Sequence, residues 1–288
     1  MRTGSAQLPG YFFEYKAYRF LLFMHYLITT FKTFSICFFL ILNAMVLSQK
    51  SVAQGNPPRV QDHNFNAWVS YSGDHNLSEK WGVHTEFVLR RYQGFKHPMQ
   101  FMPRFGINYN LSKNIMGTLG YAFVMTYPYG EYPASERFPE HRIYEQFFFK
   151  GNVSSVSFQH RYRLEQRWIK PAGTDNFLYT NRFRYNLKAS LPFQGKTIDD
   201  NEFYAAAANE FFINFGKNVA NNIFDQNRAS LALGYRYSKA LAFEFGYLNQ
   251  IVAQRNGRVF EYNHTLLASI TFNYDYPEIR AARNVPTE

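Results

Sequence analysis

The chain is poor in cysteine and in long hydrophobic runs. Its 288 residues include one cysteine, Cys37, which excludes an internal disulfide framework. The mean hydropathy is negative, which excludes a bundle of membrane-spanning helices. Acidic residues number 21 against 31 Lys and Arg. The resulting net charge of +10 leaves nucleic acid, an anionic membrane surface and acidic ligands as candidate partners.

Motifs of common enzymes and metal sites are also missing. Neither a GxSxG nucleophile motif nor a glycine-rich phosphate loop occurs. The histidines His63, His75 and His97 lack the spacing of metal ligands. We therefore expect no metal and no cofactor, and no enzyme built on these motifs.

An apolar run near the N-terminus has the length of a signal-peptide core. Residues 33–47 follow Lys32, and residues 51–53 (SVA) fit the small-x-small pattern of a cleavage site. The run is shorter than the roughly 20 residues that a spanning helix needs, although a membrane anchor is the alternative interpretation. We expect residues 1–53 to be a signal peptide with an N-terminal extension, and Met24 is a candidate true start.

Cleavage after Ala53 would change the composition of the chain. It would leave 235 residues and remove Cys37. It would also lower the formal net charge to +6, because five Lys and Arg residues and one Glu are lost. Export of the mature chain argues against a nucleic-acid partner.

Aromatic residues make up 19% of the sequence and alternate with polar ones. Residues 99–111 and 115–127 both show this alternation, which predicts strands with one apolar and one polar face. In residues 155–169 all the charges share one face, opposite Tyr162 and Leu164. Eleven segments carry the pattern: 65–77, 81–92, 99–111, 115–127, 141–150, 155–169, 177–191, 202–215, 228–238, 241–253 and 260–274.

Two of these segments are ambiguous. In 141–150, three consecutive phenylalanines leave the faces unassigned, and the alanines at 205–208 favour a helix. Most segments nevertheless exceed the usual length of a soluble strand and are long enough to cross a bilayer at a tilt.

Short turns alternate with long loops along the chain. The turns at 77–81, 111–115 and 237–241 share an apolar residue, a serine and one or two polar residues before the next strand. The segments 128–140 and 216–227 are longer and rich in Gly, Pro or Asn. Such alternation, with Tyr and Trp near strand ends, is typical of an outer-membrane barrel.

The fold predicted from these patterns is all-β: a transmembrane, antiparallel, up-and-down β-barrel over residues 65–276. Residues 54–64 form a short N-terminal segment and 277–288 a solvated tail. Because an even number of strands is expected, we predict about 12 strands, with ten as the alternative count. A soluble two-sheet sandwich with the apolar faces as its core is the alternative fold.

A series of motifs follows in order along the chain: Trp68, Glu86, Arg90, HRIYEQ (141–146), RYRLEQR (161–167), NRFRYNL (181–187), Asn209-Glu210, FDQNR (224–228), GYLNQ (246–250) and EYNHT (261–265). This constellation resembles a family of bacterial outer-membrane proteins known as domain of unknown function 2490 (DUF2490), over about residues 64–276. The resemblance implies a β-barrel in the outer membrane of a Gram-negative, Bacteroidota-type bacterium. It implies no particular activity.

The polar faces place a charged network inside the predicted barrel. Its members are Glu86, Arg90, Arg104, Arg161, Arg163, Glu165, Arg167, Arg182, Arg184, Glu210, Arg228, Arg236, Glu244 and Glu261. Buried charges need partners, so one reading is a structural or sensing barrel whose lumen is plugged by Arg–Glu pairs. A second is a narrow pore for small anionic solutes, since arginine suits carboxylate and phosphate.

A third reading is a lipid-modifying enzyme of the outer membrane. The candidate residues for such an enzyme are His141, His160, His264 and Ser269. Their spacing in the sequence does not predict a Ser–His–acid group. The partners we expect are outer-membrane lipids and small anionic solutes, and we expect the protein to be a monomer.

Overall fold

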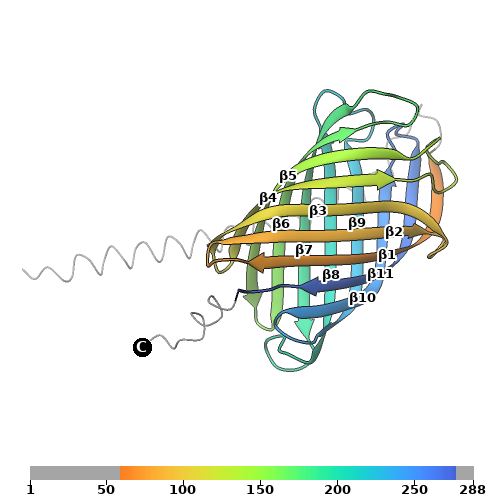
Figure 1. The fold of residues 1–288 in the computed structure, drawn as a ribbon. Coiled ribbons are helices and arrows are strands. Elements are labelled where there is room, and N and C mark those ends of the chain that lie inside the picture. Colours follow the sequence, from red (N-terminus) through yellow and green to blue (C-terminus); the bar gives the residue numbers. More distant parts are fainter. Residues whose placement is uncertain (1–58, 277–288) are drawn as a thin grey trace, which may run out of the picture. The chain divides into compact units, whose positions relative to one another are not determined.

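The structure, a computed structural model, describes residues 59–276. The predicted signal peptide, its cleavage site and the tail 277–288 lie outside the described residues. Eleven strands follow one another and close into a barrel (Figure 1), in which each strand pairs with its sequence neighbours. The strands are β1 (Val60–Asn76), β2 (Trp81–Tyr92), β3 (His97–Ser112), β4 (Ile115–Thr126), β5 (Phe138–Val153), β6 (Val156–Ile169), β7 (Leu178–Pro192), β8 (Glu202–Phe215), β9 (Phe224–Arg236), β10 (Leu241–Ala253) and β11 (Val259–Phe272).

A parallel pair of strands closes the barrel. β1 pairs with β11 from Val60 opposite Val259 to Ser72 opposite Thr271, whereas the other neighbours pair antiparallel. With eleven strands that reverse direction at every turn, the first and last must run the same way. The predicted count of about 12 was therefore wrong. Residues 60–64 prolong β1, and residues 59–276 contain no twelfth strand.

The connections divide between two ends of the barrel. The loop end carries the segments 93–96, 127–137, 170–177, 216–223 and 254–258. The turn end carries 77–80, 113–114, 154–155, 193–201 and 237–240. The predicted contrast between long and short connections has two exceptions: 93–96 at the loop end is as short as the turns, and 193–201 is a longer loop at the turn end. β1 begins at the loop end and β11 finishes at the turn end.

Serines fix two of the predicted tight turns. The Trp81 backbone N–H donates to Ser78 Oγ at 2.9 Å, and the Leu241 N–H donates to Ser238 Oγ at 3.2 Å. In each case the hydroxyl satisfies the first donor of the following strand, as short serine turns commonly do. This hydrogen bond explains why a serine recurs in these two turns.

Two strands begin within segments that the sequence analysis assigned to long loops. Glu140 and the segment 224–227 were assigned to long loops, yet they belong to β5 and β9. Both strands carry a buried carboxylate at this end, Glu140 and Asp225. From the sequence alone, a charged residue at the end of a strand predicts a loop. The pattern does not show that an arginine inside the barrel pairs with it. The alanines at 205–208 lie within β8, where pairing to β7 and β9 overrides their helical preference.

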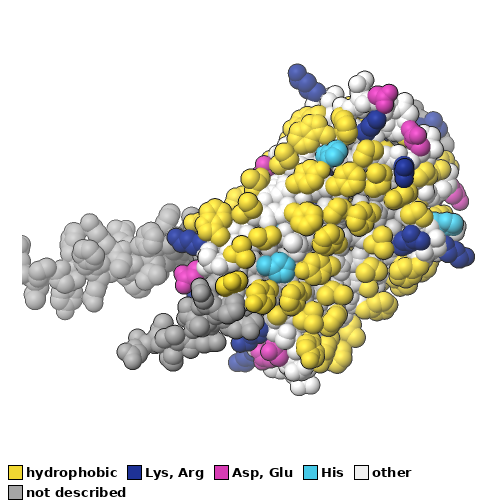
Figure 2. All heavy atoms as spheres, in the orientation of Figure 1, with side chains coloured by type: hydrophobic (Ala, Val, Ile, Leu, Met, Phe, Trp, Pro, Cys, Tyr) yellow, Lys and Arg dark blue, Asp and Glu magenta, His cyan; other side chains and the backbone are white. Residues whose placement is uncertain are grey.

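Apolar side chains lie outside the barrel and polar ones inside. Phe105 is 48% exposed, whereas Arg163 is 1% exposed. Figure 2 shows hydrophobic side chains across the visible face, with charged ones mostly toward its ends. The buried hydrophobic cluster in the interior is small: Val88, Met102 and Val124. The closed barrel with a polar interior rules out the two-sheet sandwich, whose core would be apolar. Within residues 59–276, no helix has the length and apolar character needed to cross a membrane.

Candidate functional site

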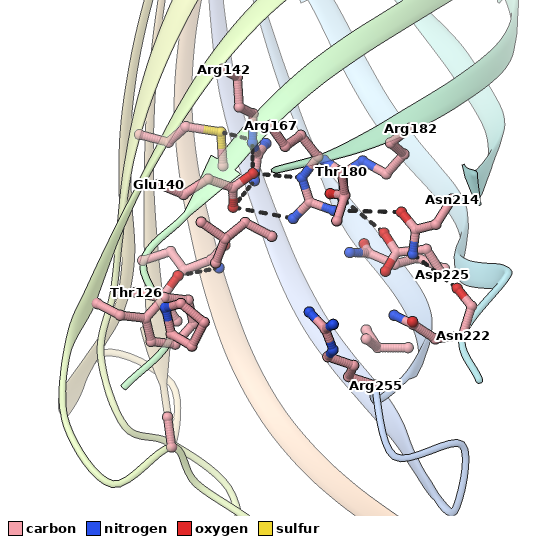
Figure 3. Close-up of a pocket in the computed structure, with 18 of the residues that line it drawn as sticks. Thr126, Glu140, Arg142, Arg167, Thr180, Arg182, Asn214, Asn222, Asp225 and Arg255 are labelled. Atoms are coloured by element: carbon pink, nitrogen blue, oxygen red, sulfur yellow. Dashed lines mark hydrogen bonds and ion pairs between the residues drawn. The ribbon is translucent and has the colours of Figure 1, made fainter. Parts of the chain in front are cut away.

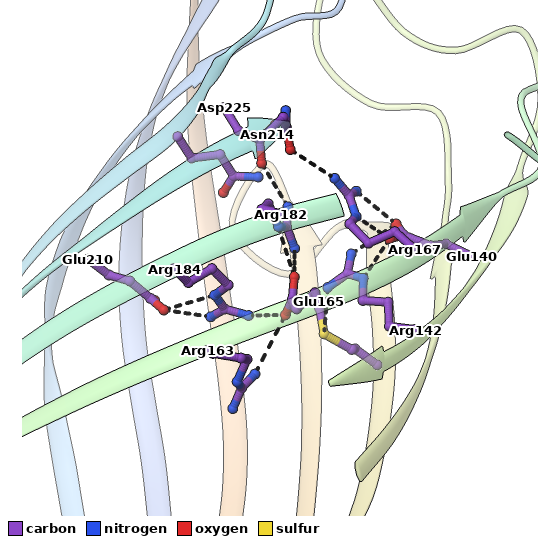
Figure 4. Close-up of polar contacts among 12 residues, drawn as sticks. Glu140, Arg142, Arg163, Glu165, Arg167, Arg182, Arg184, Glu210, Asn214 and Asp225 are labelled. Atoms are coloured by element: carbon purple, nitrogen blue, oxygen red, sulfur yellow. Dashed lines mark hydrogen bonds and ion pairs between the residues drawn. The ribbon is translucent and has the colours of Figure 1, made fainter. Parts of the chain in front are cut away.

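Two neighbouring strands, β6 and β7, form a basic wall inside the barrel. Arg163 stands opposite Arg184, and Glu165 stands opposite Arg182. Like charges opposite each other destabilise a sheet unless a counter-charge intervenes. Glu165 supplies it: one carboxylate oxygen accepts from Arg182 Nε at 2.8 Å, and the other accepts from Arg184 Nη1 at 2.6 Å (Figure 4). Glu165 is fully buried, so it holds both cations away from water.

A second carboxylate reaches the wall from β8. Glu210 Oε1 accepts from Arg161 Nη2 at 2.6 Å and from Arg184 Nη2 at 2.7 Å. Arg184 thus bridges Glu165 and Glu210, and Figure 4 shows the three side chains in one connected row. Charge-assisted, forked contacts of this kind are the strongest hydrogen bonds that side chains make.

The wall continues to the loop end through a third cluster. Glu140 accepts from Arg142 Nε at 2.6 Å and from Arg167 Nε at 2.5 Å. Nearby, Asp225 accepts from Arg182 Nη1 at 2.7 Å. Figure 3 shows these side chains projecting from different strands into one cavity, with Arg255 across from them. Each buried carboxylate here therefore faces at least one guanidinium.

A fourth cluster lies toward the turn end. Glu86 on β2 contacts Arg104 on β3, and Arg163 Nη2 lies 3.9 Å from Glu86 Oε2. His84 links this cluster to Asp74, since its Nδ1 lies 2.8 Å from Asp74 Oδ1. The clusters join because Arg163 lies between Glu86 and Glu165, with its Nη1 3.8 Å from Glu165 Oε1.

Two interior groups, Glu244 and Arg236, have partners outside the predicted network. Glu244 accepts from Lys188 and from the Tyr204 hydroxyl, at 2.9 Å for the latter. Arg236 Nη1 donates to the carbonyl oxygen of Ile198 at 2.5 Å, which ties the loop 193–201 to the barrel interior.

Glu261 contacts the long β4–β5 loop. It accepts from the Tyr129 hydroxyl at 2.9 Å. Burial and the Glu261 carboxylate raise the pKa of the Tyr129 phenol well above its usual range, so this hydroxyl stays a donor. The loop that carries Tyr129 is thereby held in the mouth of the barrel.

Two arginines in the middle of the barrel, Arg90 and Arg228, donate to neutral acceptors, unlike the arginines described above, which donate to carboxylates. Arg90 donates to Gln100 Oε1 at 2.6 Å and Arg228 to Gln226 Oε1 at 2.8 Å, both neutral acceptors. Their guanidinium carbons lie 3.8 Å and 5.1 Å from the centre of the Trp68 ring. The nearest carboxylate oxygen to Arg228 is that of Glu210, at 3.9 Å.

The fourteen residues of the predicted network lie on strands β2, β3 and β6–β11. Nine of them form ion pairs within 4.0 Å of one another: Glu86, Arg104, Arg161, Arg163, Glu165, Arg182, Arg184, Glu210 and Arg228. Arg167 pairs with Glu140, a residue outside the predicted set. Arg90, Arg236, Glu244 and Glu261 have the other partners described above.

Sequence reasoning missed several members of the network. Arg142 alternates with Tyr144 and Gln146, a signal for the inward face of β5. The run of phenylalanines at 147–149 obscured that signal. Glu145 lies on the opposite face and accepts from Gln166 at 3.1 Å. The other missed members are Asp74, Glu140 and Asp225, all near strand ends.

The residues considered for a lipid-modifying enzyme, His141, His160, His264 and Ser269, do not form one cluster. Ser269 lines the interior, whereas His264 is exposed and lies 2.6 Å from the Tyr247 hydroxyl through its Nδ1. His141 and His160 likewise contact tyrosine hydroxyls, those of Tyr121 and Tyr185. Among the described residues, no group of three or more His, Cys, Asp or Glu side chains is arranged to hold a metal ion.

Three cavities follow one another along the interior. The loop-end cavity has a volume of about 320 Å³, the central cavity about 240 Å³ and the turn-end cavity about 580 Å³. The first two share wall residues Arg90, Arg104, Arg184 and Arg228. The last two share Glu86 and Arg161. Charged side chains therefore form each boundary between cavities.

Comparisons with known proteins place the chain in a family. A search among curated proteins finds no significant match. Among solved structures, the chain is similar to the NanC porin in a rhombohedral crystal form, with 11% identity and a TM-score of 0.39 over 67% of this chain and 91% of that one. The family model described as "Protein of unknown function (DUF2490)" matches residues 65–261. The chain therefore belongs to the DUF2490 family.

Proposed function

We propose that the protein is an outer-membrane β-barrel that passes small anions through a narrow, arginine-lined lumen. The observation that carries this proposal is the row of three interior cavities, which share wall residues from the loop end to the turn end.

The outer surface supports membrane insertion. Large apolar side chains such as Phe101, Ile107 and Leu119 are exposed along neighbouring strands, an arrangement that water disfavours. Aromatic pairs stand at both ends: Trp81 lies 4.8 Å from Tyr109 at the turn end, and Trp168 lies 5.2 Å from Tyr179 at the loop end. Such aromatic girdles mark the two lipid–water boundaries of transmembrane barrels.

The charges of the lumen favour anions. The loop-end cavity is lined by eight arginines and two carboxylates, a formal excess of six positive charges. The turn-end cavity is lined by five Lys and Arg residues and three carboxylates, an excess of two. Rings of basic side chains lower the energy of a permeating anion and raise that of a cation.

Planar-bilayer recording tests conduction directly. The purified protein is expected to give steady currents whose reversal potential under a KCl gradient shows a preference for chloride. Arg255→Glu is expected to lower the anion-to-cation permeability ratio about fivefold, because reversing one charge near a permeating ion costs about 1 kcal/mol in a water-like mouth. Lys170→Glu is the control, since Lys170 also lies at the loop end but does not line the cavity. Silence at all voltages would exclude the conduit.

The β4–β5 loop limits the proposed path. Tyr129 and Ala134 of this loop line the loop-end cavity. Replacing residues 128–136 with a short glycine–serine turn is expected to raise single-channel conductance about twofold or more, because an obstruction leaves the mouth. Two glycines inserted between Lys113 and Asn114, at the turn end, should leave conductance unchanged. Unchanged conductance in the loop variant would show that the limiting constriction lies elsewhere.

A second candidate function is a structural or sensing barrel with a plugged lumen. Arg163 and Glu165 are 1% and 0% exposed, which favours a tightly filled cross-section at β6. The two candidates separate on the bilayer measurement, since a plugged barrel inserts but carries no current. A lipid-modifying activity is the remaining alternative, and a change in lipid masses on expression would identify it.

A further inference from the structure

The central cavity carries more positive charge than its own carboxylates neutralise. Its lining includes five arginines, Arg90, Arg104, Arg161, Arg184 and Arg228, and two glutamates, Glu86 and Glu210. The formal excess is therefore three positive charges in a volume of about 240 Å³. Glu165, outside this cavity, offsets part of the charge of Arg184 only.

Arg90 is the clearest uncompensated cation. It is 5% exposed, and its one side-chain hydrogen bond goes to the neutral Gln100. Among the described residues no carboxylate forms an ion pair with it, and its Nε has no acceptor. Placing a charge in a protein interior without a counter-charge costs several kcal/mol.

Arg228 and Arg104 add unused donors to the same cavity. The Nε atoms of both are buried without an acceptor. Arg228 shares Glu210 with two arginines that lie closer to that carboxylate, at 2.6 Å and 2.7 Å against 3.9 Å. One glutamate therefore serves three guanidinium groups.

Trp68 holds two of these guanidinium groups in place. The indole contacts both Arg90 and Arg228 through its ring, which orients the cations without neutralising them. The Trp68 Nε1–H is itself buried without an acceptor. Trp68, on β1, thus draws together arginines from β2 and β9, and adds a fourth unsatisfied donor to the lining of one cavity.

We infer that Arg90 and Arg228, both oriented by Trp68, form with Arg104 a binding site for one small oxyanion, a carboxylate or a phosphate, in the central cavity. An oxyanion supplies the charge and the acceptors that this lining lacks, and forked guanidinium donors match its geometry. The volume equals that of about eight water molecules, enough for such an ion with part of its hydration.

The remaining lining fits an ion that carries further polar groups. Ser70, Ser230 and Ser269 present hydroxyls to the cavity, and Leu248 and Leu267 form an apolar side. Hydroxyls both donate and accept, so they pair with the uncharged part of a small organic acid or with its water.

This site deepens the proposed conduction, because it gives the path a saturable step in the smallest of the three cavities. The binding site and the conduit can nevertheless be disproved independently of each other. Binding without current would retain the site and remove the conduit. Anion-selective current without saturable binding would retain the conduit and remove the site.

Isothermal titration of the full-length, detergent-purified protein with inorganic phosphate, and separately with acetate, tests the site. At constant ionic strength set by KCl, we expect saturable binding of at least one of the two ions, and the tighter ion identifies the source chemistry. Arg90→Gln with Arg228→Gln should weaken that binding at least tenfold. The control, Arg236→Gln, removes an interior arginine that lines the turn-end cavity and should leave binding unchanged.

Folding is checked in the same samples by thermal unfolding. Without phosphate or acetate, the double variant should be at least as stable as the unsubstituted protein, because the positive charge that it loses exceeds what the two carboxylates of the cavity neutralise. Should the double variant misfold, Arg90→Lys retains the charge and is expected to weaken binding by its loss of the forked donors. Absence of saturable binding to both ions, or equal binding in the Arg90 variants, would overturn the site.

Discussion

Replacing Glu165 with glutamine is expected to lower the free energy of unfolding by about 3–5 kcal/mol. Glu165 is the shared counter-charge of Arg182 and Arg184 and lies 3.8 Å from Arg163. Glutamine keeps the size of the side chain but removes its charge. Asp225, Glu210 and Glu86 would remain as partners of Arg182, Arg184 and Arg163, but the charge that these three buried guanidinium groups share would be gone and their mutual repulsion would rise.

Urea unfolding of the protein in lipid vesicles, followed by gel mobility and tryptophan fluorescence, measures this change. Asp175→Asn is the matched control, because it also removes a carboxylate paired with a cation, here Lys170, but at an exposed site. Exposed ion pairs contribute little, so the control should unfold at the same urea concentration as the unsubstituted protein. Equal stability of the two variants would mean that water or an ion, and not Glu165, compensates the wall.

Replacing Phe105 with arginine is expected to destabilise the inserted barrel by about 2–4 kcal/mol. Phe105 lies near the middle of β3 with its side chain exposed on the outer surface. If that surface faces acyl chains, a charge at this depth must be buried in hydrocarbon or drag water into it. Refolding into vesicles, with the folded fraction measured against denaturant, gives the difference in stability.

The same substitution near the end of that strand provides the control. Leu111 is also exposed, but it lies beside the turn 113–114, where an arginine reaches the lipid–water boundary. Leu111→Arg should therefore cost only about 0–1 kcal/mol. Equal, small effects of both variants, with a protein that purifies without detergent, would contradict membrane insertion.

Local patterns predicted most of the strands because alternation is a property of each strand alone. In β6 the residues from Arg161 to Arg167 assign its two faces without reference to any neighbour. The serine turns at 77–80 and 237–240 are likewise local, since a hydroxyl three residues ahead of the strand satisfies its first N–H. The sequence therefore predicts the basic inward faces of β6 and β7 without any knowledge of the carboxylates that pair with them.

The failures occurred where a residue's environment depends on distant strands. Glu140 and Asp225 were assigned to loops, although they form ion pairs inside the barrel with arginines of β6 and β7. Trp68 could not be placed against Arg228, because β1 and β9 are not neighbouring strands and their side chains meet only in the closed barrel. The strand count was wrong for the same reason, since the expectation of an even number took no account of a parallel β1–β11 pair.

The sequence by itself determined which side chains face outward and which face inward, because side chains alternate across a strand whatever its neighbours are. The tertiary structure alone decided which charges meet. Register and closure set how far each strand is displaced along the next, and that displacement brings Glu210 of β8 to Arg161 of β6 and leaves Arg90 without a carboxylate. Composition supplied an excess of arginine, and the geometry of the closed barrel concentrated part of it around one cavity.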